Sequence, residues 1–242
     1  MELAKSHLDI GLFTNNREKM LAFWQGKVGL AFDHLGKLGG GVHQLRHFLG
    51  DGPAGPILKI NDSRNPLPAA PPSGYRELLI AREEVSVPQT LVDPDGNRLA
   101  LVPPGYCGVG GIGMRMGVRS LAAFEDFYGR ILGLPKVPVA DGPVFACDDS
   151  VILAFHDSDA SGDAVQFAQG YRYLTVQIFD ADHEYETVLQ RGGSGGMAPK
   201  TLGATVRYGF IRDPDGNWIE LSQRATLTGS IASSKGATGE NG

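Results

Sequence analysis

Apolar and polar residues alternate along several short stretches of the chain, and a period of two residues predicts β-strands. In the stretch HLDIGLF, which starts at His7, the apolar residues Leu8, Ile10 and Leu12 alternate with polar or small ones. Residues 15–30 then repeat large apolar side chains at helical spacing, namely Met20, Phe23, Trp24 and Val28. A helix here would cover the Leu and Ile face of the strand, so we expect the face with His7 to be concave.

This order of strand and helix returns in the second half of the chain. Residues 111–134, GIGMRMGVRSLAAFEDFYGRILGL, align without gaps with residues 7–30. The stretches LVDPDGNRLALV (91–102) and IRDPDGNWIELS (211–222) share Asp-Pro-Asp-Gly-Asn in the same register. Proline presets the backbone of a turn, aspartate hydrogen-bonds locally and glycine accepts a positive φ, so both stretches predict a tight turn before a final strand.

A further internal match divides each copy into two half-units. GYRELLIAR (74–82) aligns with GYRYLTVQI (170–178), and in the second copy the helical stretch ADHEYETVLQR follows. In the first copy the interval before the next DPDGN turn is much shorter. A crossover helix needs about a dozen residues, so we expect the second half-unit to have lost its helix.

The predicted fold class is therefore α+β, built from tandem βαβββ modules in four half-units of which the second is truncated. We expect an N-terminal domain over residues 1–105 and a C-terminal domain over residues 108–225. Residues 226–242 are rich in Gly and Ser without hydrophobic periodicity, which predicts a disordered tail.

Composition and charge narrow the classes of partner. The net charge of −5 and the pI near 5.7 argue against nucleic acid or an anionic membrane as the main partner, which leaves small molecules or proteins. No stretch approaches the roughly 18 apolar residues of a membrane span, and we expect a soluble, cytoplasmic protein. Cys107 and Cys147 lack disulfide or metal-site spacing, which suits a reducing compartment. A homodimer is an alternative that the sequence leaves open.

The leading strand HLDIGLF, the helix ending FYGRILGL and the closing RDPDGNWIEL together resemble the vicinal oxygen chelate superfamily over residues 6–224. That superfamily includes glyoxalase I, extradiol dioxygenases and bleomycin resistance proteins. The resemblance implies that paired modules close into a cup with a divalent metal on its concave face. It further implies that the opening strands and the Glu of the last strand carry the metal ligands.

By this resemblance, His7 and Glu220 stand at ligand positions for a divalent metal, with Fe, Mn, Ni, Zn and Co not distinguished. The other expected ligand positions carry different residues: Glu77, Ala100, Gly111 and Tyr173. Such a metal needs three or four ligands, usually two histidines and a carboxylate. If neighbouring modules pair, His7 and Glu220 lie in different cups. If the first half-unit, module one, pairs with the fourth, module four, then His7 and Glu220 face each other, and Ala100 belongs to a degenerate cup.

Other polar residues are candidates for the same site. Tyr173 is a candidate general acid or base, and Gln177 and Trp218 lie on the same polar faces as Tyr173 and Glu220. His43 and His47 lie four residues apart in a strand and could bind substrate or supply a third ligand; partly buried strand histidines are the alternative. Arg115 would suit a carboxylate or phosphate, with a salt bridge to Glu77 as the alternative.

The preferred function is a glyoxalase-like isomerase, epimerase or lyase that acts on a small oxygenated metabolite with metal assistance, with His7, Glu220 and Tyr173 as catalytic residues. An extradiol-type dioxygenase is the first alternative. A metal-free binding protein resembling bleomycin resistance proteins is the second. The chain has no GxSxG, HExxH, Walker or DxDxDG pattern, so nucleophilic and phosphoryl-transfer chemistry have no support.

Overall fold

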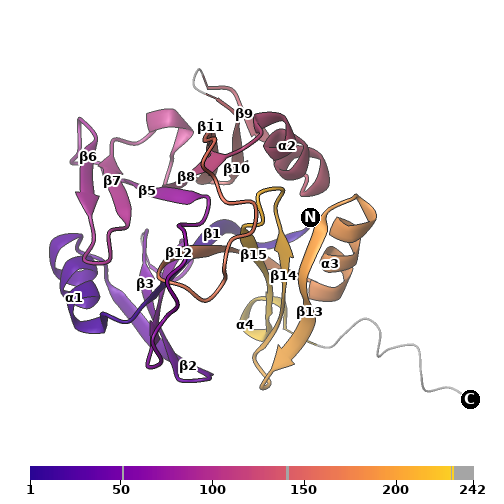
Figure 1. The fold of residues 1–242 in the computed structure, drawn as a ribbon, viewed down its shortest axis with the longest axis horizontal. Coiled ribbons are helices and arrows are strands. Elements are labelled where there is room, and N and C mark those ends of the chain that lie inside the picture. Colours follow the sequence, from indigo (N-terminus) through magenta and orange to yellow (C-terminus); the bar gives the residue numbers. More distant parts are fainter. Residues whose placement is uncertain (51, 140–141, 230, 232–242) are drawn as a thin grey trace, which may run out of the picture.

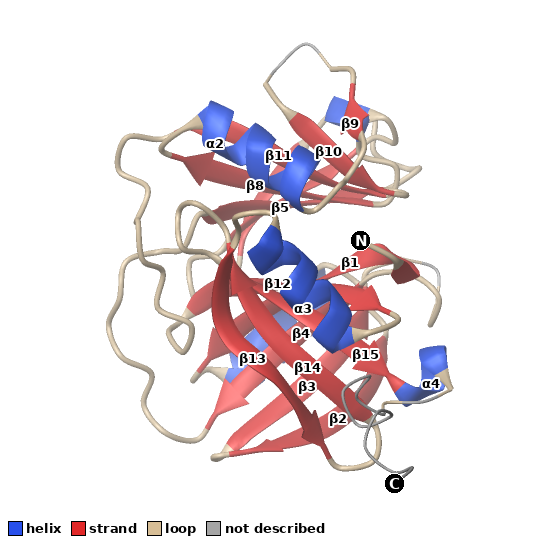
Figure 2. Ribbon diagram, turned by 90° about the vertical axis from the view of Figure 1, so that its right-hand side faces the viewer, coloured by secondary structure: helices blue, strands red, loops and turns tan. Residues whose placement is uncertain are grey.

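The computed structural model describes residues 1–50, 52–139, 142–229 and 231, and most of the predicted tail lies outside these residues. Its strands form two curled mixed sheets, which Figure 2 shows one above the other. The eight-stranded sheet has the order β13-β14-β15-β12-β1-β4-β3-β2. Its strands are β1 (Leu3–Thr14), β2 (Phe32–Gly39), β3 (Val42–Phe48), β4 (Ile57–Ser63), β12 (Gly170–Ile178), β13 (Ser194–Leu202), β14 (Val206–Arg212) and β15 (Trp218–Arg224).

The seven-stranded sheet has the order β6-β7-β5-β8-β11-β10-β9 and is drawn in the upper part of Figure 1. Its strands are β5 (Tyr75–Ala81), β6 (Gln89–Val92), β7 (Arg98–Val102), β8 (Ile112–Val118), β9 (Lys136–Val137), β10 (Val144–Cys147) and β11 (Ser150–His156). Because the structure consists of two mixed sheets with a few helices packed against them, the α+β prediction is confirmed.

The helices repeat the internal symmetry of the sequence. They are α1 (Arg17–Leu21) with its π-helical extension η1 (Ala22–Lys27), the 3₁₀ turn η2 (Tyr106–Gly108), α2 (Leu121–Glu125) with its π-helical extension η3 (Asp126–Ile131), α3 (Ala181–Gln190) and α4 (Ala225–Thr228). Both π-helical turns close with an i→i+5 hydrogen bond, from Val28 N to Phe23 O at 3.0 Å and from Leu132 N to Phe127 O at 2.9 Å. The predicted match of residues 7–30 with 111–134 thus extends to the same backbone irregularity.

The truncated half-unit is also as predicted. β5 and β12 are the matching opening strands, but β5 leads to β6 without a helix, whereas β12 is followed by α3. The two DPDGN turns agree in detail. Asp93 and Asp213 each accept hydrogen bonds from the backbone N–H groups two and four residues later, at 2.8–3.0 Å, and Gly96 and Gly216 have positive φ.

The pairing of modules is the one in which the first module joins the fourth. β1 pairs antiparallel with β12, and β5 pairs antiparallel with β8, so the second and third modules share the other sheet. Each sheet therefore contains residues from both predicted domains, 1–105 and 108–225. The proposed boundary near residue 105 falls between β7 and β8, two strands of the same sheet that lie on either side of β5, because the two copies are interleaved in space.

The main hydrophobic core lies between the two sheets and the helices. β1 contributes Leu8, Ile10 and Leu12, which belong to the same buried cluster as Leu78 of β5 and Met114 of β8. The alternation in HLDIGLF is thus confirmed for its apolar face. With this face directed into the molecule, the opposite face of the eight-stranded sheet lines a cup.

The concave side of the seven-stranded sheet is filled by the chain itself. Val109, in the segment between β7 and β8, packs in a small apolar cluster with Leu79, Ala100 and Leu153. A Cβ at Gly113 would lie only 2.8 Å from a Val109 methyl carbon, so that glycine makes room for the segment. Ala100 stands where the other sheet has Glu220, and a carboxylate in this apolar packing would have no partner.

Candidate functional site

The concave face of the eight-stranded sheet encloses a cavity of about 530 Å³. Apolar side chains form most of its wall, whereas polar groups of β4, β12 and β15 form its floor. The wall includes Phe13, Leu67, Phe167, Met197, Tyr208 and Phe210. The size and the mixture of apolar wall with few polar groups are typical of a small-molecule site.

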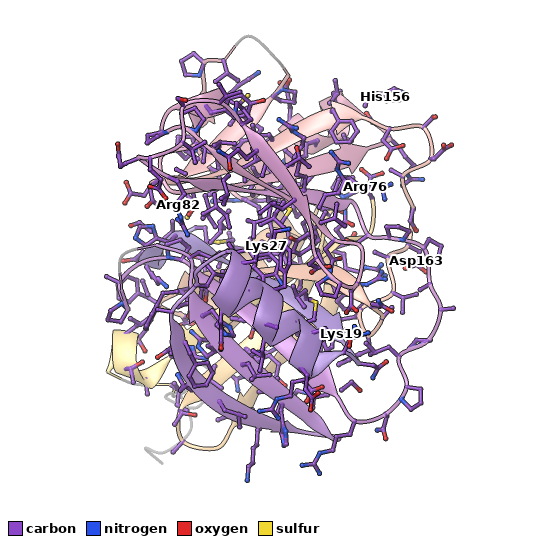
Figure 3. All side chains as sticks on the ribbon, turned by 90° about the vertical axis from the view of Figure 1, so that its left-hand side faces the viewer. Lys19, Lys27, Arg76, Arg82, His156 and Asp163 are labelled. Carbon is purple, nitrogen blue, oxygen red and sulfur yellow. The ribbon has the colours of Figure 1, made fainter. Side chains whose placement is uncertain are left out.

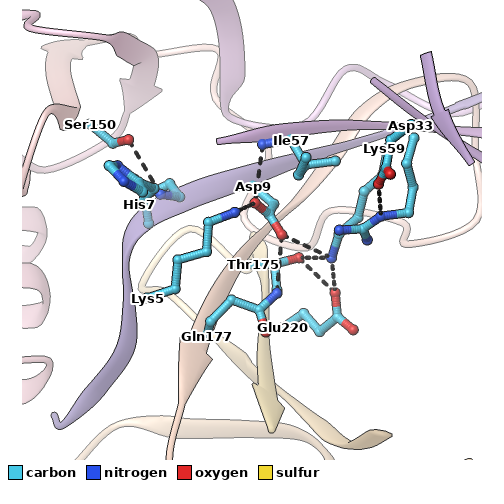
Figure 4. A network of polar contacts seen from close by, with 12 residues as sticks. Lys5, His7, Asp9, Asp33, Ile57, Lys59, Ser150, Thr175, Gln177 and Glu220 are labelled. Carbon is cyan, nitrogen blue, oxygen red and sulfur yellow. Dashed lines mark hydrogen bonds and ion pairs between the residues drawn. The ribbon is translucent and has the colours of Figure 1, made fainter. Parts of the chain in front are cut away.

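Lys59 lies at the centre of the floor, and its side chain is 2% exposed. Its Nζ donates hydrogen bonds to Thr175 Oγ1 at 2.6 Å and to Glu220 Oε2 at 2.8 Å. The Thr175 hydroxyl also donates to Glu220 Oε2 at 2.6 Å. Register explains this meeting, because Thr175 pairs with Glu220 across β12 and β15 while Lys59 projects from β4 to the same side (Figure 4).

Asp9 is fully buried behind the cavity floor. Its carboxylate accepts hydrogen bonds from the backbone N–H of Ile57 at 3.1 Å, from Gln177 Nε2 at 3.0 Å and from Lys5 Nζ at 3.3 Å. Lys59 Nζ lies 3.8 Å away. These donors satisfy a charge that burial would otherwise make costly, so Asp9 helps to hold Lys59 in place (Figure 4).

Tyr173 forms the next part of the floor. Its hydroxyl oxygen accepts hydrogen bonds from Asn61 Nδ2 at 3.1 Å and from Gln44 Nε2 at 3.3 Å. Its ring fills the space that a Cβ at Gly11 would take, so a glycine is required there. With both bonds accepted at the oxygen, the hydroxyl hydrogen stays available for a group in the cavity.

Burial governs the pKa values in this cluster. Burial lowers the pKa of the Lys59 ammonium below its ordinary value, although Glu220 and Asp9 oppose the change. Burial would raise the pKa of Glu220, but Lys59 and Thr175 hold it below its usual range. Burial raises the pKa of the Tyr173 phenol, which keeps it protonated at neutral pH. The cluster therefore contains an ionised carboxylate, a neutral phenol and an amine that releases its proton more readily than usual.

The donor set does not fit the divalent metal that the resemblance implied. Of the expected ligands, β15 supplies Glu220, but β4 places the Lys59 ammonium within 2.8 Å of that carboxylate, where a metal ion would lie. Among the described residues, no group of three or more His, Cys, Asp and Glu side chains is placed to hold a metal ion. An ammonium at hydrogen-bond distance competes with a metal for the same oxygen.

His7 does not reach the cavity. A bulge interrupts β1 there, since Lys5 pairs with Gln177 and Leu8 pairs with the adjacent Val176. His7 therefore loses the strict alternation, and its Nδ1 lies 2.5 Å from Asp149 Oδ1 of the other sheet. The expectation that His7 and Glu220 share one hollow is wrong, because register in a bulged strand cannot be counted in steps of two.

The other histidines also lie elsewhere. His43 and His47 share one face of β3, as predicted, but it is the face opposite to Gln44, which lines the cavity. His47 Nε2 lies 2.9 Å from Gln25 Nε2 of η1, and His43 lies beside Arg64. The structure thus contradicts their assignment to substrate binding, because β3 turns its histidines toward the helix and the rim.

Arg115 takes the alternative role. Its Nη1 donates a hydrogen bond to Glu77 Oε2 at 2.7 Å. Both residues belong to the seven-stranded sheet, whereas Glu220 belongs to the eight-stranded sheet. Gln177 and Trp218 lie close to the cavity without lining it. Gln177 reaches it only through Asp9, and Trp218 packs behind Phe210 with ring centroids 5.8 Å apart. Of the predicted site residues, Tyr173 and Glu220 line the cavity together.

Lys59 is the main residue of the cavity that was not predicted from the sequence. In the stretch GPILKINDS, Lys59 and Asn61 alternate with Leu58 and Ile60, which is the pattern of a strand with one polar face. This alternation could have marked Lys59 as an inward-facing charge. Its partners could not have been found in the same way, because β1 and β4 are neighbours only through the fold.

Comparisons with known proteins agree with this architecture. Residues 112–221 match the profile of the Glyoxalase/Bleomycin resistance protein/Dioxygenase superfamily. Glyoxalase I from Zea mays superposes with a TM-score of 0.72 at 14% identity, covering 92% of each chain. The "putative dioxygenase" from Bacillus subtilis subsp. subtilis str. 168 superposes with a TM-score of 0.67 at 14% identity, covering 98% of this chain and 94% of that one. No curated protein sequence matches the chain.

The fold is one of paired βαβββ modules, with a cavity on the concave face of the eight-stranded sheet. The resemblance seen in the sequence is thereby confirmed: residues 112–221 match the Glyoxalase/Bleomycin resistance protein/Dioxygenase superfamily, and 92% of the chain shares the fold of glyoxalase I. Within the described residues, no helix is long and apolar enough to cross a bilayer.

Proposed function

We propose that the cavity of the eight-stranded sheet catalyses proton transfer next to a carbonyl group of a small oxygenated compound. The reaction would be an isomerisation, epimerisation or elimination of the glyoxalase type. The observation that supports this proposal most is the position of Lys59, a buried amine on the cavity floor between Glu220 and Thr175. A buried lysine with a lowered pKa is a typical general base.

In this mechanism the neutral amine of Lys59 takes a proton from the carbon beside the carbonyl. The electron pair of the C–H bond forms the C=C bond of an enolate while the π pair of the carbonyl moves to its oxygen, and the Tyr173 hydroxyl donates a hydrogen bond to that oxygen. Lys59 then returns the proton to a neighbouring carbon or to the other face of the same carbon. In an elimination, the enolate would instead expel a leaving group. Glu220 and Thr175 keep Nζ oriented throughout.

This proposal replaces the metal of the predicted mechanism by groups of the chain itself. No step requires a metal ligand, and Lys59 carries positive charge beside Glu220 once it has taken the proton. The extradiol alternative has less support, because it needs two histidines and a carboxylate in one cup, and no histidine is found among the described residues that line the cavity. A binding protein without catalysis is supported by the apolar wall, and the same experiment separates it from the enzyme.

Solvent exchange tests the proposal without a known substrate. A panel of 2-hydroxy ketones and 2-oxo acids is incubated with the protein in D₂O, and loss of the proton beside the carbonyl is followed by NMR. The wild-type protein should exchange that proton in at least one compound, at a rate that EDTA treatment leaves unchanged. Lys59→Arg keeps the positive charge but cannot act as a base, so exchange should fall by about a hundredfold or more.

Lys59→Met is a second variant, whose fold is checked by circular dichroism because Glu220 loses its partner. Lys27→Arg, on an exposed position of η1, is the matched control and should exchange like the wild type (Figure 3). Exchange that EDTA abolishes, or that survives in folded Lys59→Arg, would contradict the mechanism. Binding of a compound without any exchange across the panel would favour sequestration.

A further inference from the structure

The cavity carries more positive than negative charge, in a chain whose net charge is −5. Of the described residues that line it, Lys59, Lys200 and Arg224 are basic and Glu220 alone is acidic, so cations outnumber anions even when Lys59 is neutral. Excess charge of one sign in a cavity with low-dielectric walls attracts a ligand of the opposite sign. The imbalance therefore favours an anionic ligand over a neutral one.

The ion pairs at the cavity floor show which cationic residue makes no ion pair with the described residues. Glu220 and Asp9 are both engaged by Lys59, at 2.8 and 3.8 Å. Asp33 lies 3.5 Å from the Nε of Arg46. Lys59 is thus shared by Glu220 and Asp9, Arg46 pairs with Asp33, and none of these ion pairs includes the guanidinium of Arg224.

Arg224 ends β15 on the same face as Glu220 and lines the cavity. Its Nε is buried and has no hydrogen-bond partner among the described residues. Buried donors of a guanidinium are nearly always paired, because an unpaired one loses its hydration without compensation. Burial and the charge of Arg46 lower the pKa of Arg224, and the charges of Glu220, Asp9 and Asp33 only partly oppose this change. Arg224 is thus a cation on the cavity wall that makes no ion pair at contact distance with the described residues, so its guanidinium can pair with an anion that enters the cavity.

Aromatic rings line the same cavity as Arg224 and Lys59. Phe13 contacts Phe167 at a centroid distance of 5.2 Å, and Tyr173 contacts Phe210 at 5.9 Å. Tyr208 lies 6.1 Å from Phe210. Such a wall favours a flat apolar body, because edge-to-face contacts with a ring add to the burial of apolar area. A phosphate or a sugar would leave this wall without complementary contacts.

We propose that the natural ligand is a small aromatic carboxylate, whose carboxylate pairs with Arg224 and whose ring lies between Phe13, Phe167 and Phe210. The inference rests on the proposed function only in using the same cavity. A guanidinium binds a carboxylate through two parallel hydrogen bonds, which orients the ligand as well as holding it. Because Arg224 and Glu220 share one face of β15, a carboxylate bound at Arg224 directs the rest of the molecule over Lys59.

Binding of a matched pair of probes tests the proposal. 2-Naphthoate carries the carboxylate, and 2-naphthamide has nearly the same shape without the charge. By isothermal titration calorimetry, the wild-type protein should bind the acid about tenfold more tightly than the amide or better. In Arg224→Gln this preference should fall to about unity, while the affinity for the amide stays the same and shows that the cavity is intact.

Arg224→Lys should keep part of the preference, since it retains the charge without the bidentate geometry. Lys19→Gln, which removes a charge from exposed α1, is the control and should keep the full preference (Figure 3). Equal binding of acid and amide, binding of neither, or an unchanged preference in Arg224→Gln would overturn the proposal. Because calorimetry measures binding alone, acid preference without any proton exchange would contradict only the proposed catalysis.

Discussion

Lys59 shows how one residue changes the chemistry that a fold can perform. The last strands of the two modules that share the cup supply Lys59 and Glu220, so the carboxylate that could have held a metal ion is paired with an ammonium. The pair is buried and is oriented by the hydroxyl of Thr175. Breaking a buried pair costs about 3–5 kcal/mol, so substitutions that remove one charge test stability as well as function.

The aspartate of the second DPDGN turn predicts a pH dependence of stability. Burial raises the pKa of Asp213 from 3.8 to about 6, despite hydrogen bonds from Asp215 and Asn217. The folded chain therefore binds this proton more tightly than the unfolded chain does. The resulting stabilisation is complete below about pH 4 and is lost as the pH rises through about 6.

Asp213→Asn should remove this dependence. Between pH 4 and pH 7, the free energy of unfolding of the wild type relative to the variant should fall, by at most about 3 kcal/mol at 1.36 kcal/mol per pKa unit. Urea titrations at both pH values measure the difference. Glu83→Gln controls for the loss of an exposed carboxylate. A relative stability that increases with pH would contradict the assignment.

At the scale of elements, a bulge and a connecting segment decide which side chains and which open space the strands present. The bulge in β1 moves His7 toward Asp149 of the other sheet, whereas Asp9 and Gly11 beyond it keep their alternation. The segment between β7 and β8 fills the concave side of the seven-stranded sheet through Val109. The eight-stranded sheet has no such segment among its described residues, so its cup stays open as a cavity.

The loop between β11 and β12 forms part of the cavity wall. Phe167 on this loop is 55% exposed but lies against Phe13 and lines the cavity. Its exposure means that Phe167→Ala should change the free energy of unfolding by less than about 1 kcal/mol. The variant should nevertheless bind 2-naphthoate about tenfold more weakly, because the ring loses an apolar contact.

Val165→Ala is the matched control for this loop, since Val165 is also exposed and does not line the cavity. Its affinity for 2-naphthoate should equal that of the wild type. If Phe167→Ala binds like the wild type, or if both variants lose affinity equally, the loop is not a specific part of the wall.

At the scale of the whole molecule, the two copies of the repeat are interleaved. β1 of the first copy pairs with β12 of the second, and β5 of the first pairs with β8 of the second. The buried cluster between the sheets contains residues of both copies. The cavity therefore depends on segments from both ends of the chain, and neither copy contains it alone.

This interleaving predicts that the copies do not fold separately. Residues 1–105 and residues 108–225, produced as separate chains, should each lack a cooperative unfolding transition, because each loses two strand pairings and part of the core. The full chain should unfold in one transition. Urea titration followed by circular dichroism distinguishes the two cases. A half that unfolds cooperatively by itself would show that the copies are independent domains.

The sequence by itself determined the local elements of this protein. Alternation set the strand of HLDIGLF, the DPDGN turns recur with positive φ at Gly96 and Gly216, and the short interval after Glu77 holds no helix. Tyr173 and Glu220 were also placed on inward faces correctly. These features depend on neighbours within a few residues, so the pattern of side chains and turn chemistry is enough to specify them.

Only the tertiary structure decided the site. Strand pairing between distant half-units brought Lys59 to Glu220, the bulge removed His7, and the apolar filling of the other cup explains why Ala100 replaces a carboxylate. Each of these outcomes depends on contacts between residues far apart in the chain. A local pattern shows which way a side chain points, whereas the partner it meets depends on which strands become neighbours.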